Sequence, residues 1–219
     1  MSNKVLDALF STNAVRVAPA DTPFWYTSGT LGPFYINTHF LIKDEATANE
    51  FLKKIEDYAF YYSQDMGIST INFNSDLEEI GNYAFYMNET IQSIQFPANL
   101  KKIGKAAFFG NTFTQDGDDY ASPQGVLQNI GFNDKLEEIG EMAFANQYLK
   151  NTFELPKGLK KVGDYAFVNC TAITKVIFNA NFEEFGVNAF AGCTGILELG
   201  IDGSNTHFKV SDNMLFTYD

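Results

Sequence analysis

The sequence predicts an α+β protein in which a repeat solenoid of about six coils follows a small N-terminal α+β segment. Three observations support this. A line of the form Leu-x-x-Ile-Gly-x-x-Ala-Phe begins, with small variations, at residues 52, 77, 100, 136, 159 and 182. An alternating apolar pair follows each copy, and a pair of charges inside each copy changes sign from one copy to the next. Such a period predicts a solenoid, since each unit buries its apolar face only against its neighbours.

The composition is that of an acidic globular protein. The chain has 219 residues, 45% of them hydrophobic, and a net charge of −12. This charge argues against nucleic acid or an anionic membrane as partner, because both need a basic surface. No apolar run reaches the roughly 18 residues of a membrane span. The start of the chain lacks a secretory signal and the two cysteines form no disulfide framework, so we expect a cytoplasmic protein.

Residues 1–51 contain no copy of the repeat and form the first predicted domain. Val5, Leu6, Leu9 and Phe10 predict a short amphipathic helix over residues 5–10. A strand is expected over residues 35–42, and a second helix over residues 44–55.

Residues 5–55 resemble the opening segment of orotate phosphoribosyltransferases. Tyr26-Thr-Ser-Gly-Thr-Leu-Gly-Pro-Phe-Tyr-Ile-Asn37 is similar to the Ser-Gly…Pro-Tyr-x-Asn loop of that family. The resemblance implies a remnant ligand loop at Ser28, Gly29, Tyr35 and Asn37. It does not imply catalysis, because the family's phosphoribosyl-pyrophosphate motif is absent and Thr27 replaces its lysine. The segment joins the repeats at residues 52–60, so the sequence is interpreted as a chimera of natural or artificial origin.

From residue 52 the chain resembles BspA-like leucine-rich-repeat proteins, on the pattern Leu-x-x-Ile-Gly-x-x-Ala-Phe followed by a polar turn and an apolar strand. The resemblance implies a curved solenoid with a parallel sheet on one face, and a role in adhesion or protein binding. We place the repeats at 52–201, with an insertion at 112–124. Residues 202–219 form a closing unit, in which 208–212 and 214–216 resemble a hairpin.

Within each copy the positions have distinct expected roles. The apolar pair that follows the repeat alternates, as in Ile94/Phe96 and Val176/Phe178, so both members should point inward from a strand. The repeat glycine should serve a tight turn or a positive-φ site. The Ala before Phe should keep neighbouring coils close. Cys170 and Cys193 occupy one position in successive copies and predict a buried row of small polar or thiol groups.

The paired charges predict contacts between coils. They are Lys53-Lys54, Glu78-Glu79, Lys101-Lys102, Glu137-Glu138, Lys160-Lys161 and Glu183-Glu184. Equivalent residues of stacked coils lie roughly 5 Å apart, so each pair should face opposite charges on both sides. We interpret this as an ion ladder that fixes register, with a charged docking stripe as the alternative.

Non-catalytic protein–protein interaction is the predicted function, by a monomer and without a cofactor. Residues 52–219 hold 22 acids and 12 bases; removing the six of each in the ladder leaves 16 acids and 6 bases, which favours a basic partner. The candidate contact residues lie in the insertion: Asp116, Asp118, Asp119 and Tyr120. Their spacing does not fit an EF-hand, and no Cys/His cluster has zinc spacing.

Two other functions stay open. One is an acidic inhibitor or antitoxin-like protein that sequesters a basic enzyme or a nucleic-acid-binding protein. The other is remnant phosphoribosyltransferase-like ligand binding by the N-terminal segment.

Overall fold

The computed structural model describes residues 53–62, 71–110 and 125–218, together with four short strands of the N-terminal region. The chain divides into two compact units, residues 1–53 and 54–219. In the first unit, β1 (Val15–Val17) pairs antiparallel with β4 (Phe34–Ile36), and β2 (Phe24–Trp25) pairs antiparallel with β3 (Leu31–Gly32).

The α+β prediction for the N-terminal segment is not supported, because the described residues contain strands and turns but no helix. The predicted helix over 44–55 is wrong at its end, where Lys54–Ile55 form strand β5. There the repeat register prevails, since Lys54 pairs with Glu79 and Ile55 with Ile80. The predicted helix over 5–10 lies outside the described residues, and the predicted strand over 35–42 overlaps β4.

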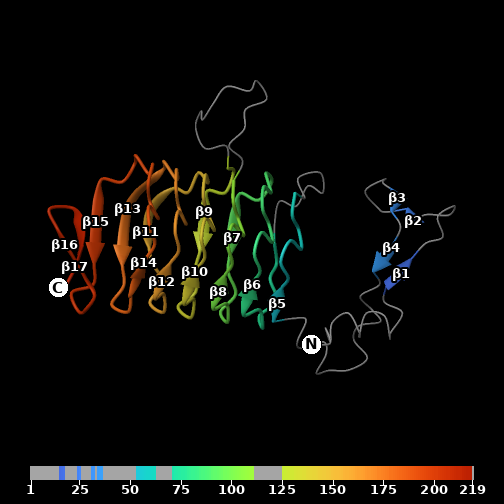
Figure 1. Cartoon of the computed structure of the whole chain (residues 1–219), viewed down its shortest axis with the longest axis horizontal. Helices are drawn as coiled ribbons and strands as arrows, with labels where there is room; N and C mark the ends of the chain where they lie inside the picture. Colours follow the sequence, from blue (N-terminus) through green and yellow to red (C-terminus); the bar gives the residue numbers. More distant parts are fainter. Residues whose placement is uncertain are drawn as a thin grey trace, which may run out of the picture. The chain divides into compact units, whose positions relative to one another are not determined.

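A parallel sheet of six two-residue strands forms one side of the second unit (Figure 1). Its strands are β5 (Lys54–Ile55), β6 (Glu79–Ile80), β8 (Lys102–Ile103), β10 (Glu138–Ile139), β12 (Lys161–Val162) and β14 (Glu184–Phe185). They lie in sequence order, and we number the coils one to six by these strands. The chain makes about five full turns between β5 and β14, so the predicted solenoid is confirmed.

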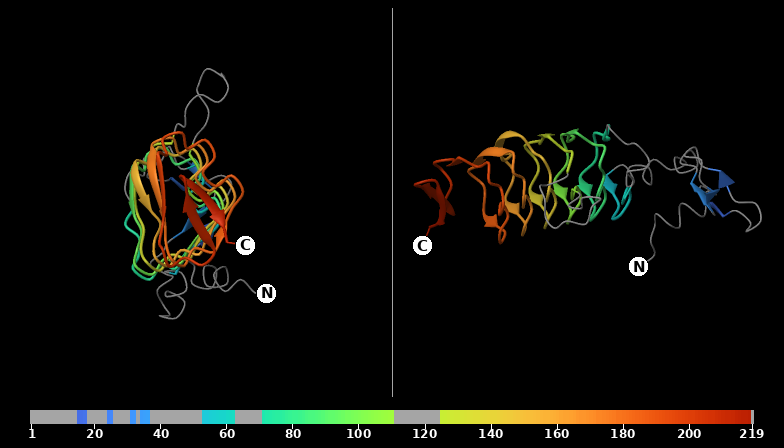
Figure 2. Two further views of the ribbon diagram at one scale, coloured as in Figure 1. Left: turned by 90° about the vertical axis from the view of Figure 1, so that its left-hand side faces the viewer. Right: turned by 90° about the horizontal axis from the view of Figure 1, so that it is seen from above.

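The opposite side of the solenoid holds the strands that follow the second to sixth repeats: β7 (Ser93–Gln95), β9 (Asn129–Gly131), β11 (Asn151–Glu154), β13 (Ile173–Phe178) and β15 (Glu198–Ile201). Strands β7 and β9 pair in parallel, as do β11, β13 and β15. Viewed along the axis in Figure 2, the coils superpose with a strand on each side. The predicted inward pairs are confirmed, since Ile94, Phe96, Val176 and Phe178 are buried.

Stacked phenylalanines form the centre of the core. The rings of Phe85, Phe108, Phe144 and Phe167 stack at centroid spacings of 5.1 to 5.4 Å, and each is at most 3% exposed. The alanine before each of these phenylalanines is fully buried, as expected for a position that lets coils approach. Apolar burial of this kind is the dominant stabilising term in folding.

The turn prediction for the repeat glycines is wrong in one respect. Residues two places after the glycine and two after the phenylalanine have positive φ, for example Tyr83 at 56° and Met87 at 54°. The repeat glycines themselves do not have positive φ. Among the described glycines, Gly192 has positive φ, and it does not occupy the repeat-glycine position. Left-handed residues at these two places turn the chain between its two strand sides in every coil but the third, where Ala106 has positive φ and Gly110 does not.

A hairpin closes the last coil. Strand β16 (Phe208–Ser211) pairs antiparallel with β17 (Met214–Thr217), which confirms the predicted hairpin. The Phe208 ring lies 5.6 Å from that of Phe182 in coil six, and Phe208 is 8% exposed. Phe208 therefore extends the hydrophobic core beyond the last coil.

Candidate protein-binding face

Charges of alternating sign lie side by side on the six-stranded sheet, as the sequence predicts. The register places Lys54, Glu79, Lys102, Glu138, Lys161 and Glu184 in one row. Ion pairs cross between neighbouring coils: Lys101–Glu78 (2.7 Å), Lys161–Glu184 (2.9 Å), Lys102–Glu138 (3.4 Å), Lys160–Glu137 (3.6 Å) and Lys54–Glu79 (3.7 Å). A hydrogen bond to Glu184 and its charge raise the pKa of Lys161. The ladder is therefore a structural contact between coils.

A second row of side chains follows the repeat glycines, or Glu56 in coil one, and neighbouring coils are bonded through it. The carboxylate of Asp57 accepts hydrogen bonds from the Asn82 backbone N–H (2.8 Å) and side-chain amide (3.1 Å). Asn82 Oδ1 accepts from the Lys105 N–H (2.8 Å), and Lys105 Nζ lies 2.9 Å from Glu141 Oε2. In the last two coils Asp164 Oδ1 accepts from the Val187 N–H (2.7 Å).

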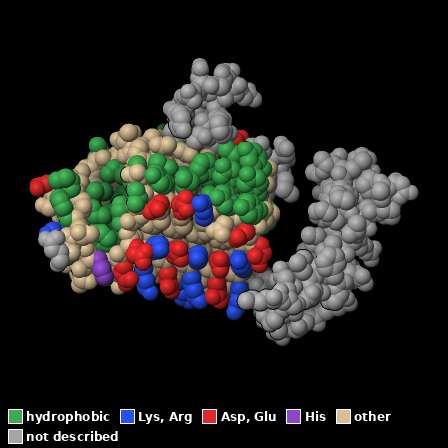
Figure 3. All heavy atoms as spheres, viewed as in Figure 1, with side chains coloured by type: hydrophobic (Ala, Val, Ile, Leu, Met, Phe, Trp, Pro, Cys, Tyr) green, Lys and Arg blue, Asp and Glu red, His purple; other side chains and the backbone are tan. Residues whose placement is uncertain are grey.

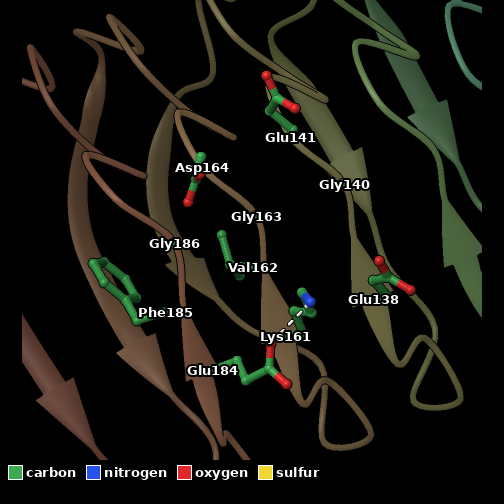
Figure 4. Close-up of a pocket in the computed structure, with 10 residues that line it drawn as sticks. All are labelled: Glu138, Gly140, Glu141, Lys161, Val162, Gly163, Asp164, Glu184, Phe185 and Gly186. Atoms are coloured by element: carbon green, nitrogen blue, oxygen red, sulfur yellow. Dashed lines mark ion pairs between the residues drawn. The ribbon is translucent and has the colours of Figure 1, made fainter.

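Between the ladder and the second row, coils four to six enclose an open groove of about 470 Å³ (Figure 4). Gly140, Gly163 and Gly186 line it, and Phe185 lies at one end. The charged residues that line it are Glu138, Glu141, Asp164, Glu184 and Lys161. Glu138, Glu141 and Glu184 pair with Lys102, Lys105 and Lys161, so among the described residues Asp164 is the lining carboxylate outside these ion pairs and favours a cationic group.

Aromatic side chains gather on coils one to three. We call this group the tyrosine patch; it comprises Tyr58, Tyr61, Tyr62, Tyr83, Tyr86 and Phe109. The three residues of coil one are 57%, 44% and 48% exposed, and the other three are half-buried. Figure 3 shows hydrophobic side chains gathered over the first coils, above the rows of charge. Exposed apolar patches of this kind often mark interaction sites.

The patch is an ordered array. Tyr58 stacks on Tyr83 at 5.0 Å and 6°, and Tyr61 stacks on Tyr86 at 5.1 Å and 10°. Phe109 continues the second column at 5.0 Å from Tyr86. Burial, with the neighbouring phenols of the patch, raises the pKa of Tyr86, so its hydroxyl is neutral at physiological pH.

Fold requirements do not explain these aromatic residues. The position of Tyr58 and Tyr83 is occupied in later coils by Ala106, Met142, Tyr165 and Asn188, with φ also positive. The position of Tyr61, Tyr86 and Phe109 is occupied by Ala145, Val168 and Ala191. The solenoid accepts alanine or asparagine at the first position and alanine at the second, so the patch is an addition to the repeat rather than part of its core.

The two cysteines have a structural role. Cys170 Sγ donates to the Phe144 carbonyl (3.2 Å) and Cys193 Sγ to the Phe167 carbonyl (3.0 Å). In coil four, Gln147 occupies the repeat position of the two cysteines, and its Nε2 donates to the Phe108 carbonyl (2.7 Å). Burial raises the pKa of the Cys170 thiol well above its ordinary value, which disfavours a nucleophilic thiolate. The predicted buried row of polar and thiol groups is confirmed.

The site residues named from sequence stay predictions. Asp116, Asp118, Asp119 and Tyr120 lie outside the described residues, as do Ser28, Gly29 and Asn37. Tyr35 lies in β4, where its backbone pairs with Arg16 of β1.

Sequence reasoning missed the tyrosine patch. The rings that stack on each other belong to successive coils, so they are about one repeat apart in the chain, and no motif identifies them. A signal was present in the repeat alignment, where the position directly after the repeat phenylalanine is aromatic in coils one to three and is alanine or valine in coils four to six.

Residues 42–116 and 120–216 match the model of a family described as "BspA type Leucine rich repeat region (6 copies)". No curated protein matches the chain. The family match overlaps the end of the segment that resembles orotate phosphoribosyltransferases, and no comparison supports that second resemblance. The predicted leucine-rich-repeat family is confirmed; the predicted phosphoribosyltransferase-like segment is not supported.

Several solved structures are similar in fold. A leucine-rich repeat protein from Eubacterium ventriosum is 16% identical with a TM-score of 0.56, over 68% of this chain and 36% of that one. A leucine rich cell surface protein from Faecalibacterium prausnitzii is 23% identical with a TM-score of 0.52, over 62% and 32%. A T. pallidum leucine rich repeat protein is 24% identical with a TM-score of 0.56, over 67% and 62%.

The chain spans about a third of the length of the first two of these proteins. At these identities the likeness shows the fold alone. Proteins of this repeat family and fold are typically non-catalytic. Across the described part of the chain, no cluster of three or more His, Cys, Asp or Glu side chains is suited to a metal ion. The described residues also contain no helix that could span a membrane.

Proposed function

Because the chain belongs to the BspA-type leucine-rich-repeat family, we propose that it is a non-catalytic protein-binding module. The contact surface is the face that carries the tyrosine patch and the ion ladder. A rigid solenoid presents such a face in a pre-formed state, which lowers the ordering cost of binding. This role agrees with the protein-binding or surface-adhesion role that the family suggests.

The exposed tyrosine patch is the observation that supports this proposal most directly. Tyrosine is enriched at protein interfaces, because it offers a large rigid contact area with few rotatable bonds and a polar hydroxyl. Tyr58, Tyr61 and Tyr62 are each more than two-fifths exposed, although residues of this size usually pack away from water. Later coils show that the fold does not need them.

A basic partner fits the charge of the module. The 16 acids and 6 bases outside the ladder residues of 52–219 leave an acidic surface. The groove on the same face is lined by more carboxylates than ammonium groups. Opposite charge on a partner speeds association and disfavours acidic competitors.

The test is affinity capture with the full chain as bait, run at low and high salt. The variants are Tyr61→Ala/Tyr86→Ala in the patch and Tyr148→Ala as control, since Tyr148 lies outside the patch and is 43% exposed. We expect the wild type and the control to retain the same proteins, the patch variant to lose them, and high salt to release them. Retention of the same proteins by all three baits would contradict the proposal.

The same experiment addresses the alternatives. An inhibitor or antitoxin-like role requires that a captured enzyme or nucleic-acid-binding protein loses activity in the complex. A cytoplasmic location and a monomeric state are part of the same proposal. A surface-adhesion role instead requires that captured proteins be extracellular.

A further inference from the structure

The tyrosines of coil one are the most exposed residues of the tyrosine patch. Among the described residues, Tyr83 is the ring that stacks on Tyr58, and Tyr86 is the ring that stacks on Tyr61. Tyr58 and Tyr61 contact each other edge to face, at 5.6 Å and 64°. They begin their columns and keep 57% and 44% of their surface exposed. Exposed aromatic faces attract cations through the negative charge of the ring face.

The patch is continuous with the acidic groove. The hydrogen-bonded second row runs from Asp57 through Asn82 and Lys105 to Glu141. In the chain, Asp57 and Asn82 directly precede Tyr58 and Tyr83 of the patch. Lys105 lies between the patch and the groove, and its ammonium group pairs with Glu141. Among the described residues, Asp164 is the groove carboxylate that lies outside these ion pairs, so it is the one that faces a cationic ligand.

The two parts lie within reach of one short peptide. Tyr61 lies in coil one and Asp164 in coil five, so four coil steps of about 5 Å separate them, roughly 20 Å in total. An extended chain covers about 3.3 Å per residue, so about six residues span this distance. A single extended segment can therefore contact both.

We propose that this face binds an extended, arginine-containing segment of a partner protein. An arginine stacks on the exposed rings of Tyr58 and Tyr61, and a second cationic residue about six positions away enters the groove beside Asp164. This rests on the proposed function, and it adds the contact residues and the chemistry of the partner.

Arginine fits this surface better than lysine. The guanidinium group is planar and weakly hydrated, so it stacks on an aromatic ring while its N–H groups still donate hydrogen bonds. Tyr and Arg are also two of the residue types most enriched at energetic hot spots of interfaces. An anionic ligand is disfavoured, because the groove carboxylates and the net charge of −12 oppose it.

The test uses a fluorescent nona-arginine peptide and measures its anisotropy with the full chain at near-physiological salt. The patch variant is Tyr61→Ala/Tyr86→Ala, which introduces the residue that later coils carry at this position as Ala145 and Ala191. The groove variant is Asp164→Asn, because Asn82 keeps the equivalent hydrogen bond in coil two. Tyr148→Ala is the control, and nona-lysine and a neutral cello-oligosaccharide are the comparison ligands.

We expect the patch variant to weaken nona-arginine binding about tenfold, as for an interface hot spot. The groove variant should weaken it by about threefold, and the two losses should multiply in the combined variant, because one ligand contacts both parts. Nona-lysine should bind the wild type more weakly than nona-arginine does, and this difference should become smaller in the patch variant, which keeps Tyr58. The control should match the wild type.

Three results would overturn the proposal. One is equal nona-arginine affinity for the wild type and the patch variant. Another is equal affinity of both peptides for the wild type, which indicates charge attraction alone. The third is patch-dependent binding of the oligosaccharide without binding of nona-arginine. If affinity capture still depends on the patch while nona-arginine does not bind, the protein-binding function stands and the arginine chemistry fails.

Discussion

Each repeat glycine lies where two coils come closest. A Cβ added to Gly140 would lie 2.7 Å from the Gly104 carbonyl carbon and 2.8 Å from the Lys105 nitrogen. Both atoms belong to the backbone of the preceding coil, so neither can move without shifting that coil. Glycine is therefore required by the spacing between coils, while Tyr83 and its equivalents adopt the left-handed conformation.

Replacing Gly140 with alanine should destabilise the protein by about 2 kcal/mol, the typical cost of overpacking a close-packed site. The measurement is the urea midpoint of unfolding, followed by circular dichroism. Gly203→Ala is the control, because nothing lies within 4 Å of a Cβ at that position. Equal midpoints for the two variants would show that coil spacing does not select the glycine.

At the scale of the element, the charges of the six-stranded sheet follow a fixed order. Its strands have two residues each, and backbone hydrogen bonds on either side of them, such as Gly104 N–H to the Ile80 carbonyl, continue the contact between coils. The side chains of Lys102 and Lys161 flank Glu138 in the register, and each ladder position has opposite charge beside it. The ladder penalises a shift by one coil, because such a shift would place like charges together.

The substitution Glu138→Lys should therefore reduce stability by about 1 kcal/mol, since three ammonium groups would lie in consecutive coils. Added salt should restore part of the loss by screening. Thermal unfolding at low and high salt measures this, with Glu138→Gln as the neutral control that loses less and responds less to salt. A loss that does not depend on salt would mean that packing, and not charge, is responsible.

At the scale of the whole repeat unit, each coil contacts only its neighbours, so stability is close to a sum of local terms. The hairpin β16–β17 supplies the neighbour that the last coil would otherwise lack. Phe208 packs on Phe182, and Asn213 exchanges hydrogen bonds with the backbone of Leu197 and Leu199.

The substitution Phe208→Ala should loosen coil six before the rest, at a cost of about 3 kcal/mol for a buried phenylalanine. Hydrogen exchange should become faster in β14 and β15 and stay unchanged in β6 and β7, because coupling between coils is local. Phe216→Ala in the same hairpin is the control, since Phe216 is 41% exposed. Uniform acceleration across all coils would argue against local coupling.

The solenoid, the ladder and the closing hairpin could all be predicted from the amino-acid sequence. Each of these depends on residues at fixed places within one repeat, such as the Lys-Lys and Glu-Glu pairs or the alternating Ile94 and Phe96. Stacking then brings equivalent places together whatever the rest of the chain does. The helix expected over 44–55 failed at Lys54 and Ile55, because pairing with the next coil outweighs local helical periodicity.

The candidate binding face, in contrast, emerged only from the stacked coils. Tyr61 and Tyr86 are 25 residues apart in the chain, yet their rings stack at 5.1 Å, and the groove combines carboxylates from coils four, five and six. The position directly after the repeat phenylalanine is buried in coil four, where it is Ala145, and exposed in coil one, where it is Tyr61. Exposure and clustering depend on side-chain size in neighbouring coils, and a single repeat does not contain that information.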